Sequence, residues 1–240
     1  MLFSYMQRAQ LLLDDQGIAL YNPADLITYI NLGRQQIATE CECVRDLGTL
    51  SLTGYTQSYS FGLISLPSGQ GYNSVLNVRL AAYSNSSGYK QYMTERPWEW
   101  FFRYYLSPGT SPATSSTPNI WSVLGRGTLG TIYVYPTPTG YETLTLDTVI
   151  LPNNLVLDTD TEALAYPFTD AVPFYAAYYA AFTSGNVEAA KMFWEQYTEY
   201  VSLASEGATP TTLVRESPGF AGARLARNAT TRDGVQGDNG

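Results

Sequence analysis

The chain contains no histidine among its 240 residues. Histidine is the commonest general base at neutral pH, the usual partner of a nucleophilic serine, and a frequent ligand of catalytic zinc. Its absence excludes histidine-based triads and most catalytic zinc sites. A catalytic site in this chain would have to use carboxylates, tyrosines or lysines.

Cysteine is almost absent, with only Cys41 and Cys43 in the whole sequence. They lie two residues apart in a segment predicted to be helical, where side chains at that spacing point about 200° apart and cannot form a disulfide. The simplest interpretation is a pair of small core residues in a reducing compartment. A metal or redox site is the alternative.

Long apolar runs are also missing, since the longest extend over only a few residues. A membrane-spanning helix needs about 20 apolar residues. The first ten residues, MLFSYMQRAQ, lack a cationic stretch followed by a continuous apolar one. We therefore expect a soluble chain that is not secreted through a signal peptide and has no membrane partner.

Charged residues make up only 14% of the chain, which has a net charge of −8 and 20 tyrosines. The surface must then be largely uncharged and rich in aromatic side chains, which is typical of contact surfaces. An acidic protein is poorly suited to tight binding of phosphate backbones, because Lys and Arg supply that affinity. It is suited to a surface along which nucleic acid passes without binding.

Two helices are predicted near the start of the chain. Apolar residues at helical spacing indicate the first over residues 2–15, and Gly17 ends it. Asn22 as cap and Pro23 at the first helical position mark the second, which is expected to run to about residue 45.

A pair of antiparallel helices is predicted near the other end. Thr169 is expected to cap the first, which closes at Gly185, and Asn186 begins the second. Because all these helices need apolar partners, residues 1–46 and 158–206 are expected to form one helical bundle domain. Side chains expected at subunit or bundle contacts are Arg34, Tyr175, Tyr179, Trp194 and Tyr197.

Between residues 47 and 157 the apolar period changes to two, which indicates strands. Runs at 120–124, 129–135 and 142–151 are separated by turn residues and predict a three-stranded meander. A short helix near 96–106 carries an aromatic stripe, which we interpret as core. The chain is thus expected to be α+β, with an inserted, two-layered antiparallel β domain of sandwich or meander type.

The final segment, residues 207–240, has almost no core-forming side chains. Its four arginines and three acidic residues give it a charge of +1, so the first 206 residues carry −9. A segment of this composition cannot bury itself, and we expect an extended C-terminal arm that is ordered only by a partner. Its expected contacts with that partner are Arg215, Phe220, Arg224, Leu225 and Arg227.

Three patterns suggest chemistry and are better explained structurally. Glu95 and Glu99, beside tryptophans, resemble a glycosidase pair but more often mark the exposed face of a helix. The acidic segment 158–162 has calcium-loop spacing without the required glycine and terminal glutamate, which favours a solvated turn. The GxGxxG match at 125–130 lacks a following helix. We predict no catalytic, metal or cofactor site.

One helix carries a resemblance to a known family. Residues 26–38, with Asn31, Arg34 and Glu40, resemble the "ADLLxxINxARxxIAxE" helix of head-to-tail adaptor proteins of tailed phages. Residues 130–138 and 171–197 resemble the β meander and closing helical hairpin of that family. The similarity in pattern spans about residues 23–205 and points to head-to-tail connector proteins of the tail tubular A-like type.

This resemblance implies a structural, non-catalytic virion protein without a cofactor, made in the host cytoplasm. It implies a dodecameric ring beneath the portal, which joins the portal to the tail nozzle or other tail proteins. A helical bundle would line the DNA channel, and the arm would reach the portal or a neighbouring copy. Repeated around a ring, a body of charge −9 would repel DNA and let it slide without specific binding.

A glycan-binding virion module is the alternative function, in which aromatic side chains of the β region stack on sugars. It predicts coplanar exposed aromatics on one sheet face of a monomer, whereas the adaptor predicts aromatics at subunit contacts. A virion structural protein of unspecified role and an enzyme are weaker alternatives.

Overall fold

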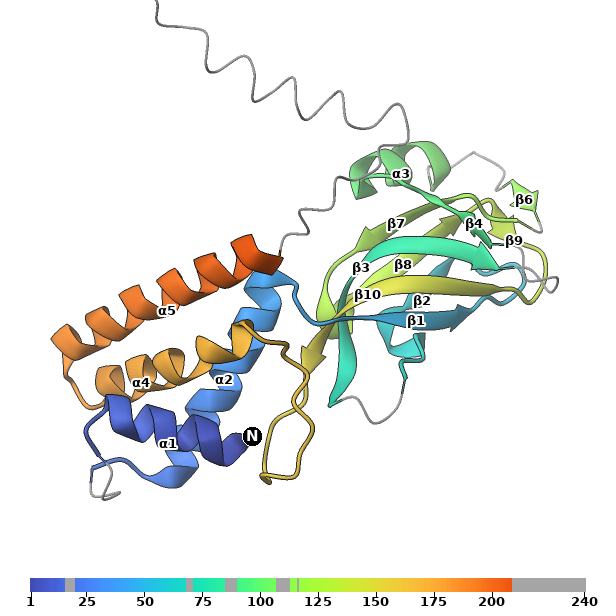
Figure 1. The fold of residues 1–240 in the computed structure, drawn as a ribbon. Helices are drawn as coiled ribbons and strands as arrows, with labels where there is room; N and C mark the ends of the chain where they lie inside the picture. The colour runs from blue at the N-terminus through green and yellow to red at the C-terminus, as the bar shows by residue number, and fades with distance from the viewer. Residues whose placement is uncertain (16–19, 68–70, 85–89, 107–112, 116, 209–240) are drawn as a thin grey trace, which may run out of the picture. The chain divides into compact units, whose positions relative to one another are not determined.

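The computed structural model describes residues 1–15, 20–67, 71–84, 90–106, 113–115 and 117–208. Within these residues α-helices and mainly antiparallel sheets form an α+β fold, as the sequence predicted (Figure 1). Residues 1–204 form one compact unit. None of the described helices is long and apolar enough to cross a membrane.

The two N-terminal helices are α1 (Leu2–Leu12) and α2 (Pro23–Cys41). The side chain of Asn22 caps α2 by accepting a hydrogen bond from the backbone of Ala24 at 3.0 Å. The predicted end of α2 near residue 45 is wrong, because Glu42 adopts a left-handed conformation (φ 48°) and ends the helix. Cys43 therefore lies beyond the helix, and Cys41 and Cys43 form no disulfide.

The C-terminal pair consists of α4 (Val172–Thr183) and α5 (Val187–Ala208). The predicted cap Thr169 is wrong, since this residue lies in the 3-10 turn η3 (Phe168–Asp170). The helix starts only at Val172, where Pro173, which has no N–H to donate, fits in the first turn. Gly185 has φ 82° in the connection to α5, a conformation that glycine adopts without strain.

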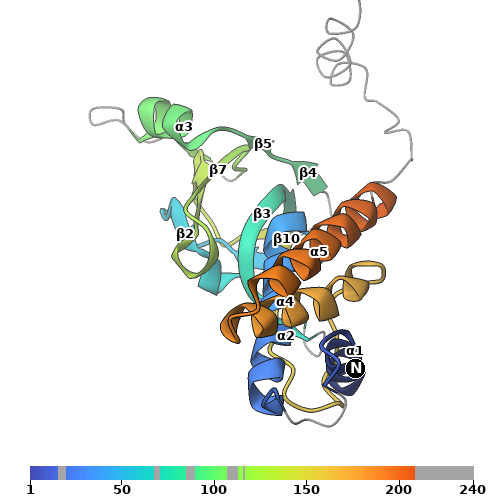
Figure 2. The same cartoon turned by 90° about the vertical axis from the view of Figure 1, so that its left-hand side faces the viewer.

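Helix α4 is the centre of the bundle. It contacts both α1 and α2, which also contact each other, and Figure 2 shows α4 beside α1 and in front of α2. Close approach to α2 depends on Gly33, where an added Cβ would lie 3.0 Å from the Cβ of Tyr175. Helix α5 packs on α4 through aromatic side chains, including Phe174 against Tyr200 at 4.8 Å between ring centres.

Strands make up two four-stranded sheets and a small third one. The first sheet has the order β1 (Arg45–Ser51), β10 (Thr143–Pro152), β3 (Tyr72–Ser84), β4 (Lys90–Tyr92), all antiparallel. The second has the order β2 (Ser58–Ser60), β8 (Thr131–Tyr135), β7 (Ile120–Leu124), β5 (Thr94–Glu95). Strand β6 (Thr114–Ser115) pairs with β9 (Thr137–Pro138), and this pair and β5–β7 are parallel.

The predicted three-stranded meander is wrong in its last strand. Strands β7 and β8 are antiparallel neighbours, joined through the 3-10 turn η2 (Gly127–Leu129), but β10 leaves them and lies between β1 and β3. The reason is that β10 is long and largely buried, with Leu144, Leu146 and Ile150 at 0% exposure. Such a strand needs hydrogen-bonding neighbours on both edges.

The short predicted helix is α3 (Trp98–Tyr105). Its aromatic stripe is core only in part. Phe101 is fully buried and Trp98 packs on Tyr133 of β8, at 4.7 Å between ring centres. Phe102, which belongs to the predicted stripe, is instead 54% exposed.

Helices and strands share one hydrophobic core cluster. It contains Ile30 and Ile37 of α2, Leu146 and Ile150 of β10, and Tyr197 of α5. A smaller second cluster lies between α4 and α5 and is rich in alanine. The division into a bundle domain and an inserted β domain stays a prediction.

Candidate functional site

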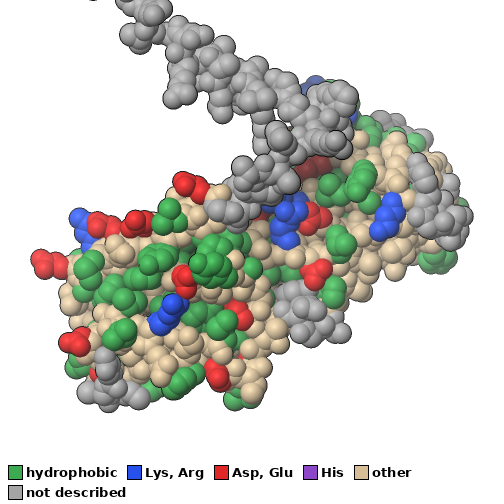
Figure 3. All heavy atoms as spheres, viewed as in Figure 1, with side chains coloured by type: hydrophobic (Ala, Val, Ile, Leu, Met, Phe, Trp, Pro, Cys, Tyr) green, Lys and Arg blue, Asp and Glu red, His purple; other side chains and the backbone are tan. Residues whose placement is uncertain are grey.

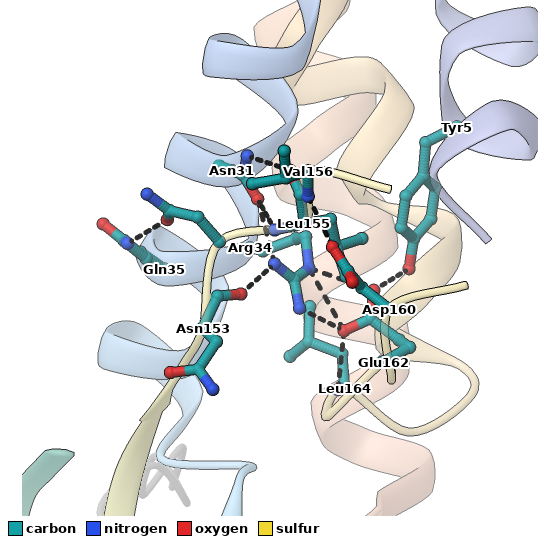
Figure 4. Close-up of polar contacts among 11 residues, drawn as sticks. Tyr5, Asn31, Arg34, Gln35, Asn153, Leu155, Val156, Asp160, Glu162 and Leu164 are labelled. Atoms are coloured by element: carbon teal, nitrogen blue, oxygen red, sulfur yellow. Dashed lines mark hydrogen bonds and ion pairs between the residues drawn. The ribbon is translucent and has the colours of Figure 1, made fainter. Parts of the chain in front are cut away.

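A fully buried arginine of α2 lies against the segment that follows β10 (Figure 4). The Nη2 of Arg34 lies 2.8 Å from Oε1 of Glu162, and its Nε lies 3.0 Å from Oε2. Its Nη1 donates to the carbonyl of Asn153 at 2.6 Å. Because both charges are removed from water, their hydrogen bonds must compensate for lost hydration.

Neighbouring polar groups complete this cluster. Asn31 of α2 donates to the carbonyl of Leu155 at 3.0 Å and accepts from its N–H at 2.8 Å. The hydroxyl of Tyr5 in α1 donates to Glu162 at 3.0 Å, and burial, followed by the negative charge of Glu162, raises the pKa of this tyrosine well above its usual range. The cluster thus ties α1 and α2 to the segment that follows β10.

The acidic segment 158–162 differs from the predicted solvated turn at one position, since the side chain of Glu162 is only 7% exposed. Asp160 accepts hydrogen bonds from the backbone of Leu157 and Val156, which lower the pKa of its carboxyl. Asp158 pairs with the amino group of Met1 at 2.6 Å, which also lowers its pKa. The described ranges contain no group of three residues suited to hold a metal.

One side of the bundle, formed by α2, α4 and α5, presents aromatic rings. We call it the aromatic flank. Ring centres lie 5.2 Å apart between Tyr29 and Tyr179, 5.1 Å between Tyr178 and Trp194, and 6.2 Å between Tyr178 and Phe182. The aromatic flank consists of Tyr29, Tyr178, Tyr179, Phe182 and Trp194.

The predicted contact residues differ in how far they are buried. Arg34, Tyr175 and Tyr197 are buried inside the bundle, where the Tyr197 hydroxyl donates to Glu40 at 2.9 Å. Burial and this bond raise the pKa of Tyr197 well above its usual range. Tyr179 is half-buried, and Trp194 is 38% exposed. Of this set, Trp194 is the most accessible to a partner.

The other side of the bundle carries an apolar groove between α1 and α5, with α4 as its floor. Its volume is about 250 Å³. Hydrophobic side chains gather over these helices in Figure 3, interrupted by a few charges. An ion pair lies among the groove residues, with Nη1 of Arg8 2.7 Å from Oδ1 of Asp170. The groove, called the α1/α5 groove below, is lined by Arg8, Leu11, Leu12, Asp170, Pro173, Phe174 and Tyr200.

A family model described as SU10 adaptor protein matches residues 4–216, which include both four-stranded sheets, helices α2 to α5 and all of α1 except its first two residues. The chain belongs to the SU10 adaptor protein family. It is a structural adaptor of phages and a component of the virion, where it interacts with other virion proteins. The family implies a non-enzymatic role and gives no support to glycan binding. A search of curated proteins finds no match.

The solvent face of α5 in the adaptor is acidic. Exposed glutamates recur along it at spacings of 7, 4 and 7 residues, which place them within about 40° of one another around the helix. Lys191 is close to this line, with its Nζ 3.9 Å from Glu195. We call this line the acidic ridge; it consists of Glu188, Glu195, Glu199 and Glu206.

The other sequence patterns acquire structural explanations in the adaptor. Glu95 belongs to β5 and Glu99 to α3, so the interpretation that they share a helix face is wrong. Partial burial raises the pKa of Glu95. The glycines at 125–130 surround the 3-10 turn between β7 and β8, without a following α-helix.

The predicted arm of the adaptor falls almost entirely outside the described residues, because only 207 and 208 are covered, as the end of α5. Its expected contact residues Arg215, Phe220, Arg224, Leu225 and Arg227 all lie beyond the described ranges.

Sequence reasoning missed Glu162 and Tyr5 as partners of Arg34. A signal was present, because an arginine between Ile30 and Ile37 falls on the apolar face of α2 and needs a buried carboxylate. The position of that carboxylate could not be found from spacing. The α1/α5 groove was missed as well, since it combines three helices that are distant in sequence.

Proposed function

We propose that the adaptor forms a dodecameric ring beneath the portal, joins the portal to the tail nozzle or other tail proteins, and lines the DNA channel. The observation that carries this proposal is the division of the bundle surface around α5. An acidic ridge runs along its solvent face, while apolar surfaces lie on both sides of it. A ring subunit needs such an arrangement, with one face toward the channel and two toward neighbours.

The acidic ridge is the surface we assign to the channel. Glutamates repeated around a ring repel the phosphate backbone, so duplex DNA is kept away from the wall and slides without specific contacts. The body of charge −9 acts in the same direction.

The segment 207–240 is proposed as an arm that reaches the portal or a neighbouring copy. Its charge of +1 is complementary to the acidic body, and it contains few core-forming side chains. Ordering such a segment on a partner couples its folding to assembly. We further propose that residues 1–46 and 158–206 act as the bundle domain and 47–157 as the inserted domain.

Truncation after Gly207 tests the role of the arm. Binding of the full chain and of the truncated chain to purified portal rings is compared by sedimentation. We expect truncation to abolish binding while the circular dichroism spectrum and thermal melt stay unchanged. Equal binding by both chains would contradict the role of the arm.

Charge reversal tests whether the arginines of the arm pair with acidic groups of the partner. The double variant Arg224→Glu and Arg227→Glu is expected to weaken portal binding, because both arginines are assigned to acidic groups of a partner. The matched control reverses Arg96 and Arg103, which are exposed in the β region. Unchanged assembly of the arm variant in low salt would reject this assignment.

Ring formation is measured directly by native mass spectrometry of the adaptor with and without the portal. A closed assembly of identical copies supports the proposal, and twelve copies are expected. A chain that stays a monomer at high concentration and on the portal would overturn it.

A further inference from the structure

Among the described residues, the bundle presents accessible apolar faces on either side of α5, one through Tyr200 and one through Trp194. The α1/α5 groove is lined by residues of α1, and the aromatic flank includes Tyr29 of α2. The line of α5 between them is the acidic ridge. A closed ring of many copies requires two such different faces on each subunit, because its contacts are heterologous.

The dimensions of the groove suit a protein side chain. Its volume of about 250 Å³ is below the ~300–1,000 Å³ of small-molecule sites, and it suits a single large aromatic group. The exposed side chain of Leu11 (63%) is one wall, and Phe174 stacked on Tyr200 is another. The Arg8 side chain is 56% exposed, so its guanidinium plane is accessible above the groove.

The aromatic flank supplies an anchor of that kind. Trp194 is 38% exposed, and its indole is held between Tyr178 and Tyr197, with ring centres 5.1 and 5.2 Å away. Phe182 beside it is 56% exposed. A tryptophan already fixed by its neighbours loses little conformational entropy on docking, which is the usual character of a binding hot spot.

The distribution of charge also favours contact between the aromatic flank and the α1/α5 groove. The body of each copy carries −9, and two acidic ridges brought together would repel. The five residues of the aromatic flank are uncharged, and the charged groove residues Arg8 and Asp170 balance each other. These two faces can therefore meet without opposing like charges.

We propose that Trp194 of one copy, with Phe182 beside it, docks in the α1/α5 groove of the next copy. The exposed guanidinium of Arg8 then lies over the indole in a cation–π contact, the type for which tryptophan is the strongest partner. This assignment rests on the ring proposed above and identifies the faces that close it.

Directional cross-linking tests the contact. Cys41 and Cys43 are replaced by serine in the full chain, and Leu11→Cys or Trp194→Cys is then introduced with a short bismaleimide as linker. In the presence of the portal, a mixture of the two single-cysteine chains should give cross-linked dimers, whereas each chain alone should not. A chain carrying both substitutions should give a ladder up to the ring. Leu129→Cys combined with Trp194→Cys is the control, since Leu129 is 85% exposed in the β region.

The outcomes separate this inference from the proposed function. A ring that assembles on the portal without cross-links between positions 11 and 194 would overturn the inference and leave the function standing. Cross-links between two copies of the same single-cysteine variant would show that identical faces meet. That result would also overturn the inference. Failure to assemble at all would overturn both.

A second measurement does not depend on cross-linking. Leu11→Arg blocks the groove from an exposed position, and we expect it to weaken association between copies by at least about thirty-fold. Trp194→Ala should do the same. Leu129→Arg, an exposed apolar-to-arginine change outside both faces, should not. Sedimentation equilibrium reports association, and unchanged thermal melts confirm folding. Association unaffected by Leu11→Arg would contradict the contact.

Discussion

Arg34 and Glu162 lie 128 residues apart in the sequence and form a two-point ion pair between α2 and the segment after β10, with Nη2 2.8 Å from Oε1 and Nε 3.0 Å from Oε2. Their side chains are 0% and 7% exposed. Because a buried charge without its partner is costly, this pair makes the position of the segment after β10 depend on α2.

Removing one member of the Arg34–Glu162 pair should therefore lower the free energy of unfolding more than removing both members. We expect Arg34→Met to lower the free energy of unfolding by about 3–5 kcal/mol, and the double variant Arg34→Met/Glu162→Leu to recover most of that loss. Urea unfolding measures both. Arg8→Met breaks the more exposed pair with Asp170 and is the control, with an expected loss of at most ~1 kcal/mol. A double variant as unstable as Arg34→Met would contradict the interpretation.

The raised pKa values of two buried tyrosines predict that the folded state loses stability at alkaline pH. The pKa values of Tyr5 and Tyr197 are raised above the ordinary 10.0, mainly by burial and then by Glu162 and Glu40. The folded state then holds the phenolic proton more tightly than the unfolded chain, so this stabilisation is present below pH 10 and is lost as the pH rises above it. Thermal melts between pH 9 and 11 should fall less steeply for Tyr5→Phe and Tyr197→Phe than for the unmodified chain. Parallel curves would refute this.

The lowered pKa of Asp160 predicts that the stability of the folded state falls as the pH is lowered, which is opposite to the tyrosine effect. Hydrogen bonds from Leu157 and Val156 lower the pKa of its carboxyl below the ordinary 3.8, so its contribution is present above that value and is lost as the pH falls through the lower folded pKa. Asp160→Asn should reduce the loss of stability below pH 4. Chemical unfolding at pH 3 and pH 6 measures the difference, with Asp25→Asn, on the exposed first turn of α2, as the control. An equal loss of stability between pH 6 and pH 3 in the unmodified chain, Asp160→Asn and Asp25→Asn would contradict this role of Asp160.

Gly33 predicts a steric limit at the contact between α2 and α4. An added Cβ would lie 3.0 Å from the Cβ and Cδ1 of Tyr175, so a larger side chain must separate the helices. We expect Gly33→Leu to cost at least about 1–3 kcal/mol, the usual range for overpacking. Thr28→Leu adds the same side chain at an exposed position of α2 and should change stability little. Equal denaturant midpoints for the two variants would show that the helices adjust freely.

The acidic ridge predicts how the ring treats DNA. Glu195→Lys with Glu199→Lys replaces two negative charges by two positive ones on the face assigned to the channel, a net change of +4 per copy. We expect the assembled variant to retain duplex DNA, with binding that weakens steeply as salt increases. Glu95→Lys with Glu99→Lys adds the same charge in the β region as the control. Gel mobility of DNA with each ring measures retention, and equal retention by both variants would contradict the assignment of the ridge.

Local sequence signals predicted much of the fold. Asn22 and Pro23 gave the start of α2, alternating residues gave β7 and β8, and Gly185 with Asn186 gave the turn of the helical hairpin. Each depends on residues within a few positions of one another. The C-terminal end of α2 and the start of α4 were predicted less accurately, because they depend on the strand or turn that adjoins them.

The predicted subunit or bundle contact residues differ in how deeply the structure buries them. Tyr175 and Tyr197 lie inside the bundle, whereas Trp194 is accessible on the aromatic flank. Helical periodicity puts all of them on apolar faces. Which of those faces another helix covers depends on how α4 and α5 pack, and spacing along one helix carries no such information.

The sequence alone determined the α+β class, the positions of most helices and strands, and the resemblance to phage adaptors, because periods, caps and turns are properties of neighbouring residues. The tertiary structure decided that β10 lies between β1 and β3, that Glu162 meets Arg34, and that the α1/α5 groove and the aromatic flank lie on either side of α5. These relationships join residues far apart in the chain. They arise because a buried strand needs hydrogen-bonding partners on both edges and a buried charge needs its counter-ion, and only the folded chain brings those partners together.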